Sequence, residues 1–362
     1  MKIGILTYHR SYNFGAQLQA VALRTKLAAM GHSVYFINYW PRYHYEMYAL
    51  FPPHTIIQRM KHPRSGAHYV KFLVSCFPRR YKKMRIMWKF MKEYSCPYWK
   101  PYDNKTAYDA VIYGSDQIWR KQLGLGNKFN PVYFGDNILP AKKHIAYAAS
   151  MGKMKLTPDD ERFLKETMSR FDKISVRESD LNDELVRLGI NSQVTLDPTL
   201  LLQSQEWDKL LEPHRMIKEN YALFYEITFE SFDRKAMKQW ARQHNLRFIE
   251  VKGRAASILP QKDVFDVVPP QAFVSLIKHA ELVFTSSYHG LVFSLLYNKK
   301  FYASYSSNAL RAKSLLQALG LEHCLLAPLS PLPDNLPQID YNQVNIKMQE
   351  LRKGSLHFLK NL

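Results

Sequence analysis

Several features that define common protein classes are scarce in this sequence. Its 362 residues contain only three cysteines, Cys76, Cys96 and Cys324, which lie far apart and show no CxxC spacing. This pattern fits neither a disulfide framework nor a zinc cluster. No stretch approaches the ~18 consecutive apolar residues of a membrane-spanning helix, and the first residues lack the apolar core and cleavage site of a signal peptide. We therefore expect a cytoplasmic protein.

Motifs for the commonest cofactors and hydrolytic mechanisms are also missing. The chain contains no GxGxxG and no Walker pattern, which leaves a dinucleotide or P-loop site unsupported. It contains no HExxH, no GxSxG and no Asp/His pattern suited to a metal. We therefore expect neither a cofactor nor a metal ion.

Acidic residues are few, and the positive excess is concentrated in one segment. The chain has 51 Lys and Arg against 31 Asp and Glu, a net charge of +20. Residues 41–105 hold 14 basic and three acidic residues, a net charge of +11, among many Tyr and Trp residues. This mixture suits an anionic surface, and because no nucleic-acid motif accompanies it, the expected partner is a membrane surface or an anionic lipid carrier. A solvated helical insertion whose aromatic residues pack on the body is the structural alternative.

Alternating strands and helices are predicted for the rest of the chain. Residues 2–7 and 33–38 are typical of strands and flank a helix at 16–30, which predicts a βαβ unit with a parallel sheet. Further strands are expected at 109–113, 144–150, 173–176, 221–226, 247–251 and 281–285. The fold class is therefore α/β, with two Rossmann-like doubly wound domains that face a cleft. We place the domains at 1–205, with the basic insertion at 41–105, and at 206–362, with a final helix that can return to the first domain.

The most informative stretch is residues 285–290 (TSSYHG), where a strand ends and a helix begins. His289 would face the positive end of the helix dipole and could donate a proton or hold an anion. Ser286 and Ser287 can cap the helix and donate to a phosphate or carboxylate, and Gly290 would let a ligand approach the backbone. A helix cap with a hydrogen-bonded structural histidine is the alternative interpretation.

Two arginines are candidate anion clamps. Arg177 follows the strand at 173–176, and its guanidinium could bind a carboxylate or phosphate bidentately. A surface ion pair with Glu178 is the alternative. Arg311 follows the polar run at 304–308 and is the second candidate.

Polar and aromatic residues after the strand at 109–113 suit a sugar. Asp116 and Gln117 could bind sugar hydroxyls, Trp119 could stack on a sugar face, and Asp116 could also act as a base. An Asx-turn with a Trp in the core explains the same residues equally well. Asn13 lies in the loop before the first helix, a further place for a ligand.

Taken in order, these motifs resemble the polysaccharide pyruvyl transferase family. They lie at 3–7 with 13–16, 114–119, 146–150 with 152, 175–178, 196–199, and 287–290 with 293–294. The resemblance implies a fold similar to GT-B glycosyltransferases. It also implies transfer of the enolpyruvyl group of phosphoenolpyruvate to sugar hydroxyls, which forms a pyruvate ketal and releases phosphate. The acceptor would belong to a cell-surface polysaccharide or its lipid-linked precursor.

The resemblance assigns a donor site to four residues and an acid to a fifth. Arg177, Ser287, Gly290 and Arg311 would bind phosphoenolpyruvate, and His289 would protonate its methylene carbon or the departing phosphate. Some branches of the family carry an Arg at the position of Ser287. Many bacterial members carry an Asp at the preceding position, which is also Ser here, so the anion site departs from the common pattern.

The resemblance places the acceptor near the end of the strand at 109–113. Asn13, Gln117 and Trp119 would face the sugar, and Asp116 would stabilise oxocarbenium-like charge or take the hydroxyl proton. The basic segment would suit a lipid pyrophosphate-linked acceptor at the inner face of a membrane. No metal is needed for this scheme.

Two other functions are compatible with the same residues. The first is a GT-B glycosyltransferase that uses a nucleotide sugar, with Asp116 and His289 serving the acceptor and the diphosphate. The second is a non-catalytic glycan- or membrane-binding protein in which the cleft is inert. Nucleotide binding without phosphoenolpyruvate binding would favour the first, and unchanged behaviour after substitution of His289 and Arg177 would favour the second.

Overall fold

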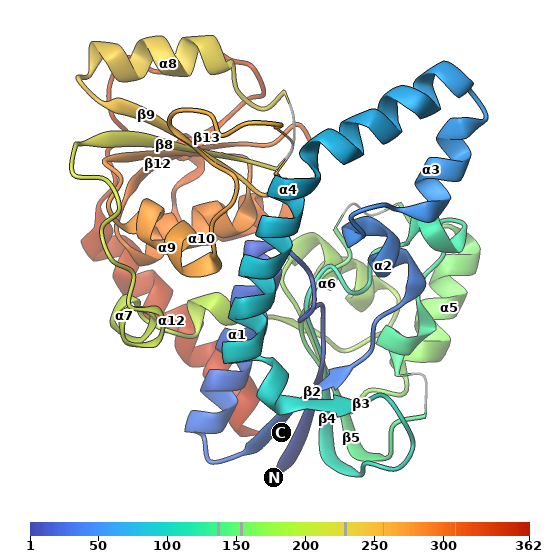
Figure 1. Cartoon of the computed structure of the whole chain (residues 1–362). Coiled ribbons are helices and arrows are strands. Elements are labelled where there is room, and N and C mark those ends of the chain that lie inside the picture. Colours follow the sequence, from blue (N-terminus) through green and yellow to red (C-terminus); the bar gives the residue numbers. More distant parts are fainter. Residues whose placement is uncertain (136–137, 153–154, 228–229, 256, 308) are drawn as a thin grey trace.

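Two parallel β-sheets with helices on their faces make up the protein (Figure 1). The structure is a computed structural model and describes residues 1–135, 138–152, 155–227, 230–255, 257–307 and 309–362. The first sheet has seven strands in the order β3-β2-β1-β4-β5-β6-β7, and the second has six in the order β10-β9-β8-β11-β12-β13. All neighbouring strands pair in parallel.

The strands of the two sheets have the following bounds. The first sheet contains β1 (Lys2–Leu6), β2 (Ser33–Asn38), β3 (Trp99–Pro101), β4 (Tyr108–Asp116), β5 (Ala141–Ala149), β6 (Lys173–Val176) and β7 (Gln193–Val194). The second contains β8 (Tyr221–Glu226), β9 (Arg247–Lys252), β10 (Val264–Phe265), β11 (Leu282–Thr285), β12 (Lys300–Ser304) and β13 (Leu325–Leu326). In each sheet the strand order reverses beside the first strand, between β1 and β4 and between β8 and β11. This is the doubly wound Rossmann pattern, so the predicted fold class is confirmed.

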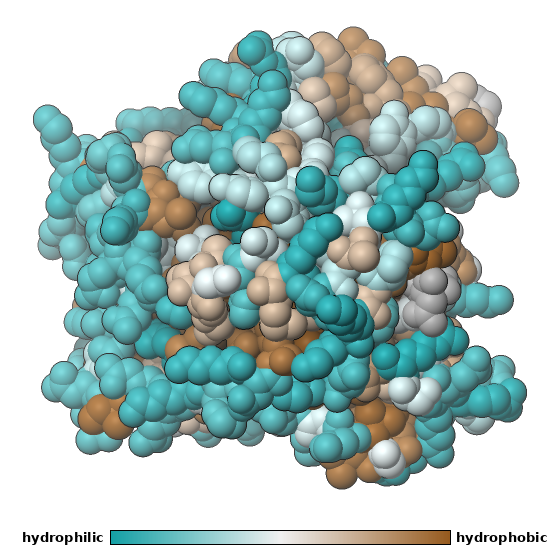
Figure 2. All heavy atoms as spheres, turned by 90° about the horizontal axis from the view of Figure 1, so that it is seen from below, coloured by the Kyte–Doolittle hydropathy of each residue, from teal (hydrophilic) through white to brown (hydrophobic). Residues whose placement is uncertain are grey.

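The helices connect these strands or extend beyond them. They are α1 (Phe14–Ala29), α2 (Arg42–Tyr48), α3 (Pro53–Met60), α4 (Pro63–Tyr94), α5 (Pro158–Met168), α6 (Ser179–Arg187), α7 (Ser204–Leu211), α8 (Arg234–Gln243), α9 (Pro270–Lys278), α10 (Tyr288–Leu296), α11 (Leu310–Leu319) and α12 (Tyr341–Lys360). Among the described residues, every helix is too short or too polar to span a membrane. The face seen from below is mostly hydrophilic, and its hydrophobic atoms form separate groups (Figure 2).

Helix α1 lies between the two sheets, which explains why it is apolar on more than one side. Ala20, Leu23 and Leu27 pack with strands of the first sheet. Phe14 and Leu18 belong to the core of the second domain, together with α9 and α10. Because both faces are covered, nearly the whole first half of the helix is buried. The start of α1 is therefore held between the domains, where both sheets contribute loops.

Helix α12 runs back from the second sheet to the first (Figure 1). Phe358 and Leu359 pack in the core of the first sheet with Ile3. The Ser355 hydroxyl accepts a hydrogen bond of 2.9 Å from the backbone N–H of Leu196. The domain boundary that we predict at residues 205 and 206 falls within α7, between the sheets, and stays a prediction.

The basic segment at 41–105 is helical, as predicted, over α2, α3 and α4. Its end departs from the prediction, because residues 99–101 form β3 and pair with β2 at the edge of the first sheet. The C-terminal half of α4 packs between the domains through Met87 and Phe90. Its N-terminal half projects away from both sheets together with α3 (Figure 1).

Candidate active site

Loops from both reversal points of strand order line one cavity of about 350 Å³. Asn13 follows β1, Asp116 ends β4 and is followed by Gln117, Ile227 follows β8, and residues 286–289 follow β11. The carboxyl ends of parallel strands beside such a reversal are the usual ligand site of doubly wound sheets. The two domains therefore place their ligand-binding ends on the same cavity.

His289 is the second residue of α10 and is held by packing on the opposite domain. Ser287 caps the helix, because its Oγ accepts a hydrogen bond from the N–H of Gly290 at 3.3 Å. The imidazole lies directly against Gly15, where an added Cβ would come within 2.0 Å of the His289 Nδ1. Gly15 is likewise the second residue of α1. The positive ends of two helix dipoles, one from each domain, therefore meet at this imidazole.

A buried carboxylate, Asp197, joins His289 to Arg177. The Asp197 Oδ2 lies 3.7 Å from the His289 Nε2 and forms an ion pair with the Arg177 Nη1. The Asp197 Oδ1 accepts hydrogen bonds from the backbone N–H of Thr199 at 2.9 Å and from its hydroxyl at 2.6 Å. These bonds fix the carboxylate at the start of a short 3-10 helix, Pro198–Leu200. Asp197 can therefore orient the imidazole from beneath.

The charges of this cluster balance one another. Burial alone would raise the pKa of Asp197, but Arg177 and His289 together hold it well below its ordinary value. Burial alone would lower the pKa of Arg177, but Asp197 and Asp116 raise it above its ordinary value. Both groups are therefore charged at neutral pH. Two N–H groups of Arg177, Nε and Nη2, have no hydrogen-bond partner among the described residues.

Tyr288 links two guanidinium groups at the edge of the cavity. The Cζ of Arg177 lies 5.3 Å from the centre of the Tyr288 ring, and the Cζ of Arg311 lies 5.2 Å from it. Burial and the nearby Arg177 both lower the pKa of Arg311, while Glu178 opposes them. An arginine in this setting gains from a bound anion, because the anion would relieve repulsion between the two cations.

A carboxylate, that of Asp116, lines the cavity. Its Oδ1 accepts a 2.8 Å hydrogen bond from the N–H of Gln117 and lies 3.8 Å from the Arg177 Nη2. Its backbone has a φ of +73°, in the left-handed region that Asp tolerates better than most residues. Asn13 also lines the cavity, but its Oδ1 caps α1 by accepting from the N–H of Ala16 at 3.1 Å. Only its amide NH₂ remains to face a ligand.

The family of the chain follows from a comparison with known protein families. Residues 13–308 match the polysaccharide pyruvyl transferase family. The chain belongs to this family. Its members are defined by transfer of a pyruvyl group to a polysaccharide, so the protein is a transferase with a sugar acceptor. A search of curated proteins finds no match.

Solved structures with a similar fold include sugar-nucleotide enzymes. The UDP-GlcNAc 2-epimerase of Methanocaldococcus jannaschii is 13% identical, with 97% of this chain and 93% of that chain covered and a TM-score of 0.45. The epimerase of Neisseria meningitidis is 10% identical, with coverage of 99% and 93% and a TM-score of 0.43. A glycosyltransferase of Rickettsia africae is 10% identical, with coverage of 98% and 93% and a TM-score of 0.43. These low scores add nothing to the family assignment.

The structure brings most of the predicted site residues of this pyruvyl transferase together. Those that line the cavity are Asn13, Asp116, Gln117, Ser287, His289 and Arg311. Arg177 lies just behind them, because its side chain is 1% exposed and its guanidinium is engaged by Asp197. The alternative prediction, a surface ion pair between Arg177 and Glu178, is wrong, because Arg177 is buried and pairs with Asp197. Glu178 is buried and instead accepts a hydrogen bond from Ser150.

Two predicted site residues lie outside the cavity. Trp119 is fully buried, donates a 2.8 Å hydrogen bond to the carbonyl oxygen of Tyr133 and stacks on Phe134. It has no exposed face on which a sugar could stack, so the core interpretation is correct. Gly290 is needed for packing within the second domain, because an added Cβ would lie 2.2 Å from the Oγ1 of Thr285. The close approach at Gly290 is therefore made by its own strand and not by a ligand.

Several residues of the site were not among the predicted ones. Arg120 and Arg254 line the cavity and, with Arg311, give it three guanidinium groups. Arg120 directly follows the motif at 114–119, whereas Arg254 lies in the loop after β9, where no motif was found. Asp197 stands in one of the family motifs, residues 196–199, and that was its only sequence signal. Tyr8 also lines the cavity and donates a 3.1 Å hydrogen bond to the carbonyl oxygen of Gln117.

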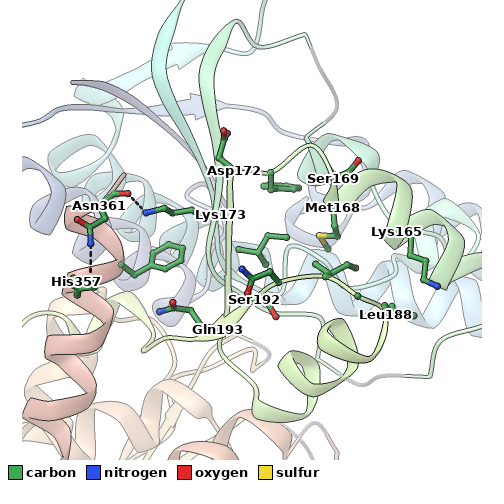
Figure 3. Close-up of a pocket in the computed structure, with 16 residues that line it drawn as sticks. Lys165, Met168, Ser169, Asp172, Lys173, Leu188, Ser192, Gln193, His357 and Asn361 are labelled. Atoms are coloured by element: carbon green, nitrogen blue, oxygen red, sulfur yellow. Dashed lines mark hydrogen bonds between the residues drawn. The ribbon is translucent and has the colours of Figure 1, made fainter.

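A larger cavity of about 570 Å³ lies at the opposite end of the first sheet (Figure 3). Lys173 and Gln193, at the beginnings of β6 and β7, line it together with the end of α12. The Lys173 Nζ donates to the backbone oxygen of Asn361. No predicted site residue lines this cavity. Among the described residues, no group of three or more His, Cys, Asp or Glu side chains is placed to hold a metal ion.

Proposed function

We propose that this pyruvyl transferase uses phosphoenolpyruvate as its donor and forms a pyruvate ketal on a sugar of a cell-surface polysaccharide or its lipid-linked precursor. One observation carries the proposal. Arg120, Arg254, Arg311 and His289 line a cavity of about 350 Å³ in which, among the described residues, Asp116 is the only lining carboxylate. A small donor with a carboxylate and a phosphate matches this excess of positive charge.

The donor would lie against the start of α10. Arg311 and the free backbone N–H groups of the first helical turn would bind the phosphate, with the Ser287 hydroxyl beside them. Arg177 would add charge from behind the cavity without direct contact, because its side chain is almost fully enclosed. Arg254, which is exposed and lines the cavity, would bind the donor carboxylate.

The first step would join one sugar oxygen to the donor. His289, oriented by Asp197, would give a proton to the methylene carbon while a sugar hydroxyl oxygen bonds to the adjacent carbon. Asp116 would take the proton of that hydroxyl. Oxocarbenium-like charge on the attacked carbon would be stabilised by the same carboxylate.

The second step would close the ketal. A second hydroxyl of the same sugar would bond to the same carbon as the carbon–oxygen bond to phosphate breaks, with the electron pair leaving on the phosphate. The proton of this hydroxyl would return to His289, and the proton on Asp116 would pass to the phosphate. Both residues would then be ready for another turnover.

Phosphoenolpyruvate binding tests the donor. Ligand-observed NMR should detect selective binding of phosphoenolpyruvate over a panel of nucleotides, and His289→Ala should weaken it. His357→Ala is the matched control, because His357 lies at the cavity of Figure 3 and should leave binding unchanged. Arg311→Gln should weaken binding by about tenfold or more, the loss of one charge-assisted contact.

Other outcomes would replace the proposal. Binding of a uridine or other nucleotide with no binding of phosphoenolpyruvate would indicate a nucleotide-sugar glycosyltransferase. No binding of either ligand class, together with no effect of His289→Ala on any measured property, would indicate a non-catalytic glycan-binding protein. Once donor binding is shown, phosphate release in the presence of candidate sugars identifies the acceptor.

A further inference from the structure

The helices α3 and α4 form an arm that extends beyond the body of the protein. In Figure 1 the N-terminal half of α4 leaves the space between the sheets, and α3 returns beside it. Residues 45–88, which hold α3 and most of α4, carry ten of the large hydrophobic side chains that are exposed among the described residues, and seven of the ten lie on the arm itself. No other segment of similar length in the described residues carries as many. The arm and the residues just before it therefore carry the densest group of exposed apolar side chains among the described residues.

The exposed apolar residues of α4 follow one line along the helix. Val74, Phe77, Tyr81 and Trp88 have the spacing i, i+3, i+7 and i+14 and are exposed by 57%, 36%, 41% and 36%. This spacing places them on one face. Phe77 stacks on Tyr81 at 5.7 Å, which holds the two rings in a common surface. We call these four residues the apolar stripe.

A neighbouring face of the same helix supplies most of the packing that holds α4 in place. Leu73, Cys76, Met87 and Phe90 on that face are at most 2% exposed. Lys83 lies among them, and its Nζ donates a 3.0 Å hydrogen bond to the carbonyl oxygen of Val268 in the second domain. This face fixes the helix to the body, whereas the apolar stripe stays partly exposed, with the Trp88 ring edge-on to Trp99 of β3 (centroids 5.8 Å apart) and the Phe77 ring stacked on Phe51 (5.7 Å).

Positive charge runs beside the apolar stripe. Helix α4 contains nine Lys and Arg and one Glu. Lys71, Lys82, Arg85 and Lys89 are exposed on the stripe side of the helix, and among the described residues none of the four is in an ion pair. Burying these unpaired basic side chains against an apolar face of another protein would be unfavourable. A surface of negative charge would instead attract them.

We propose that the arm docks on an anionic phospholipid bilayer, with the apolar stripe in the headgroup region and the lysines of α4 against the lipid phosphates. A helix with one apolar face, aromatic rings and flanking Lys and Arg lies in the plane of a bilayer interface. Each basic residue near an anionic leaflet strengthens binding, and the contribution is screened by salt. The net charge of residues 41–105, +11, provides the charge complementarity.

The arm also borders the active-site cavity. A second cavity of about 460 Å³ lies between α4 and the loop after β9 and is lined by Leu50, Tyr69, Phe72 and Met84. It shares Met47, Tyr48 and Arg254 with the active-site cavity. Docking of the arm would thus bring this second cavity, which adjoins the active-site cavity, close to the lipid. If the proposed function holds, this arrangement suits an acceptor whose lipid stays in the bilayer, but the docking itself does not depend on that function.

Flotation of the full-length protein with lipid vesicles tests the proposal without donor or acceptor. We expect binding to vesicles of phosphatidylcholine with 30% phosphatidylglycerol, little binding to phosphatidylcholine alone, and a decrease as salt is raised. Lys82→Glu/Lys89→Glu should weaken binding to the anionic vesicles by about tenfold or more. The matched control is Lys235→Glu/Arg242→Glu, which makes the same change of charge on exposed residues of α8 and should keep binding within about twofold, as expected for residues outside the contact.

A second pair of variants tests the apolar stripe. Val74→Ser/Phe77→Ser should weaken binding, whereas Val186→Ser/Ile346→Ser, at exposed positions of α6 and α12, should not. All four variants change exposed residues, so circular dichroism should show them folded. The proposal is wrong if the wild type does not bind anionic vesicles or if arm and control variants lose binding equally. Tight binding of RNA in place of vesicles would also overturn it. Each of these results leaves the phosphoenolpyruvate experiment untouched.

Discussion

The Nε2 of His289 lies 3.7 Å from the Oδ2 of Asp197, and the two residues belong to different domains. Asp197 follows the last strand of the first sheet, while His289 begins the helix after β11 in the second. The same carboxylate oxygen binds Arg177, so the acid that we propose for catalysis is oriented by a residue pair of the other domain. A change in how the two domains pack would therefore move the imidazole of His289 relative to Asp197.

Replacing Asp197 by Asn should destabilise the protein and abolish transfer. The substitution keeps the shape of the side chain but removes the nearest countercharge of the buried Arg177 guanidinium and leaves it the more distant Asp116 at 3.8 Å. Removal of one partner of a buried ion pair costs about 3–5 kcal/mol. Urea denaturation measures this loss. Asp183→Asn, an exposed acidic residue of α6, should change the free energy of unfolding by less than about 0.5 kcal/mol.

Asp197 should also make the free energy of unfolding fall at acidic pH. The pKa of Asp197 is held well below its ordinary value in the folded state, so its contribution is complete above pH about 4 and is lost as the pH falls further. We expect the free energy of unfolding of the wild type to fall more steeply below pH 4 than that of Asp197→Asn. Parallel slopes would show that the carboxylate is not stabilised in this way.

Gly15→Ala should damage the site through His289. The added Cβ would lie 2.0 Å from the imidazole Nδ1, so the ring must leave its position between α1 and Asp197. We expect activity to fall by at least about a hundredfold, because a displacement of about 1 Å at the reacting groups has this effect. Gly354→Ala in α12 is the control, since no atom lies within 4 Å of its added Cβ. That variant should gain about 1 kcal/mol from helix propensity and keep full activity.

Lys83 should make the stability of the protein rise with pH. Burial lowers the pKa of Lys83 to about 7, although Asp266 opposes this effect. Between pH 7 and the ordinary lysine value of about 10.4 the unfolded chain binds the proton that the folded protein releases. The free energy of unfolding should therefore increase with pH in this window, by at most about 1.4 kcal/mol per unit. Lys83→Met should flatten the increase, and Lys89→Met, exposed on the same helix, should not.

Trp119→Phe distinguishes a core residue from a sugar-stacking one. Loss of the buried indole and of its hydrogen bond to Tyr133 should lower the free energy of unfolding by about 1–3 kcal/mol. The KM for the acceptor should stay unchanged, because the ring does not reach the cavity. A raised KM with unchanged stability would contradict the structure at this residue.

Three strands were predicted with their observed bounds, because apolar, β-branched and aromatic residues gather in them. Residues 33–38, 173–176 and 221–226 form β2, β6 and β8 with the predicted bounds. The short edge strands β3, β7, β10 and β13 were not predicted. Each has two or three residues and is only partly buried or exposed, so its pairing is decided by the backbone of the neighbouring strand and not by its own side chains.

The local sequence determined which residues stand at the ends of parallel strands, and this was enough to bring Asp116, Ser287 and His289 to one cavity. It also determined the family, since the motifs occur in order along the chain. The tertiary structure alone decided that Trp119 is buried, that Arg177 lies behind the cavity and that Asp197 reaches His289. These contacts join segments up to about ninety residues apart, and their geometry depends on how two separately formed sheets pack on α1, which no local pattern encodes.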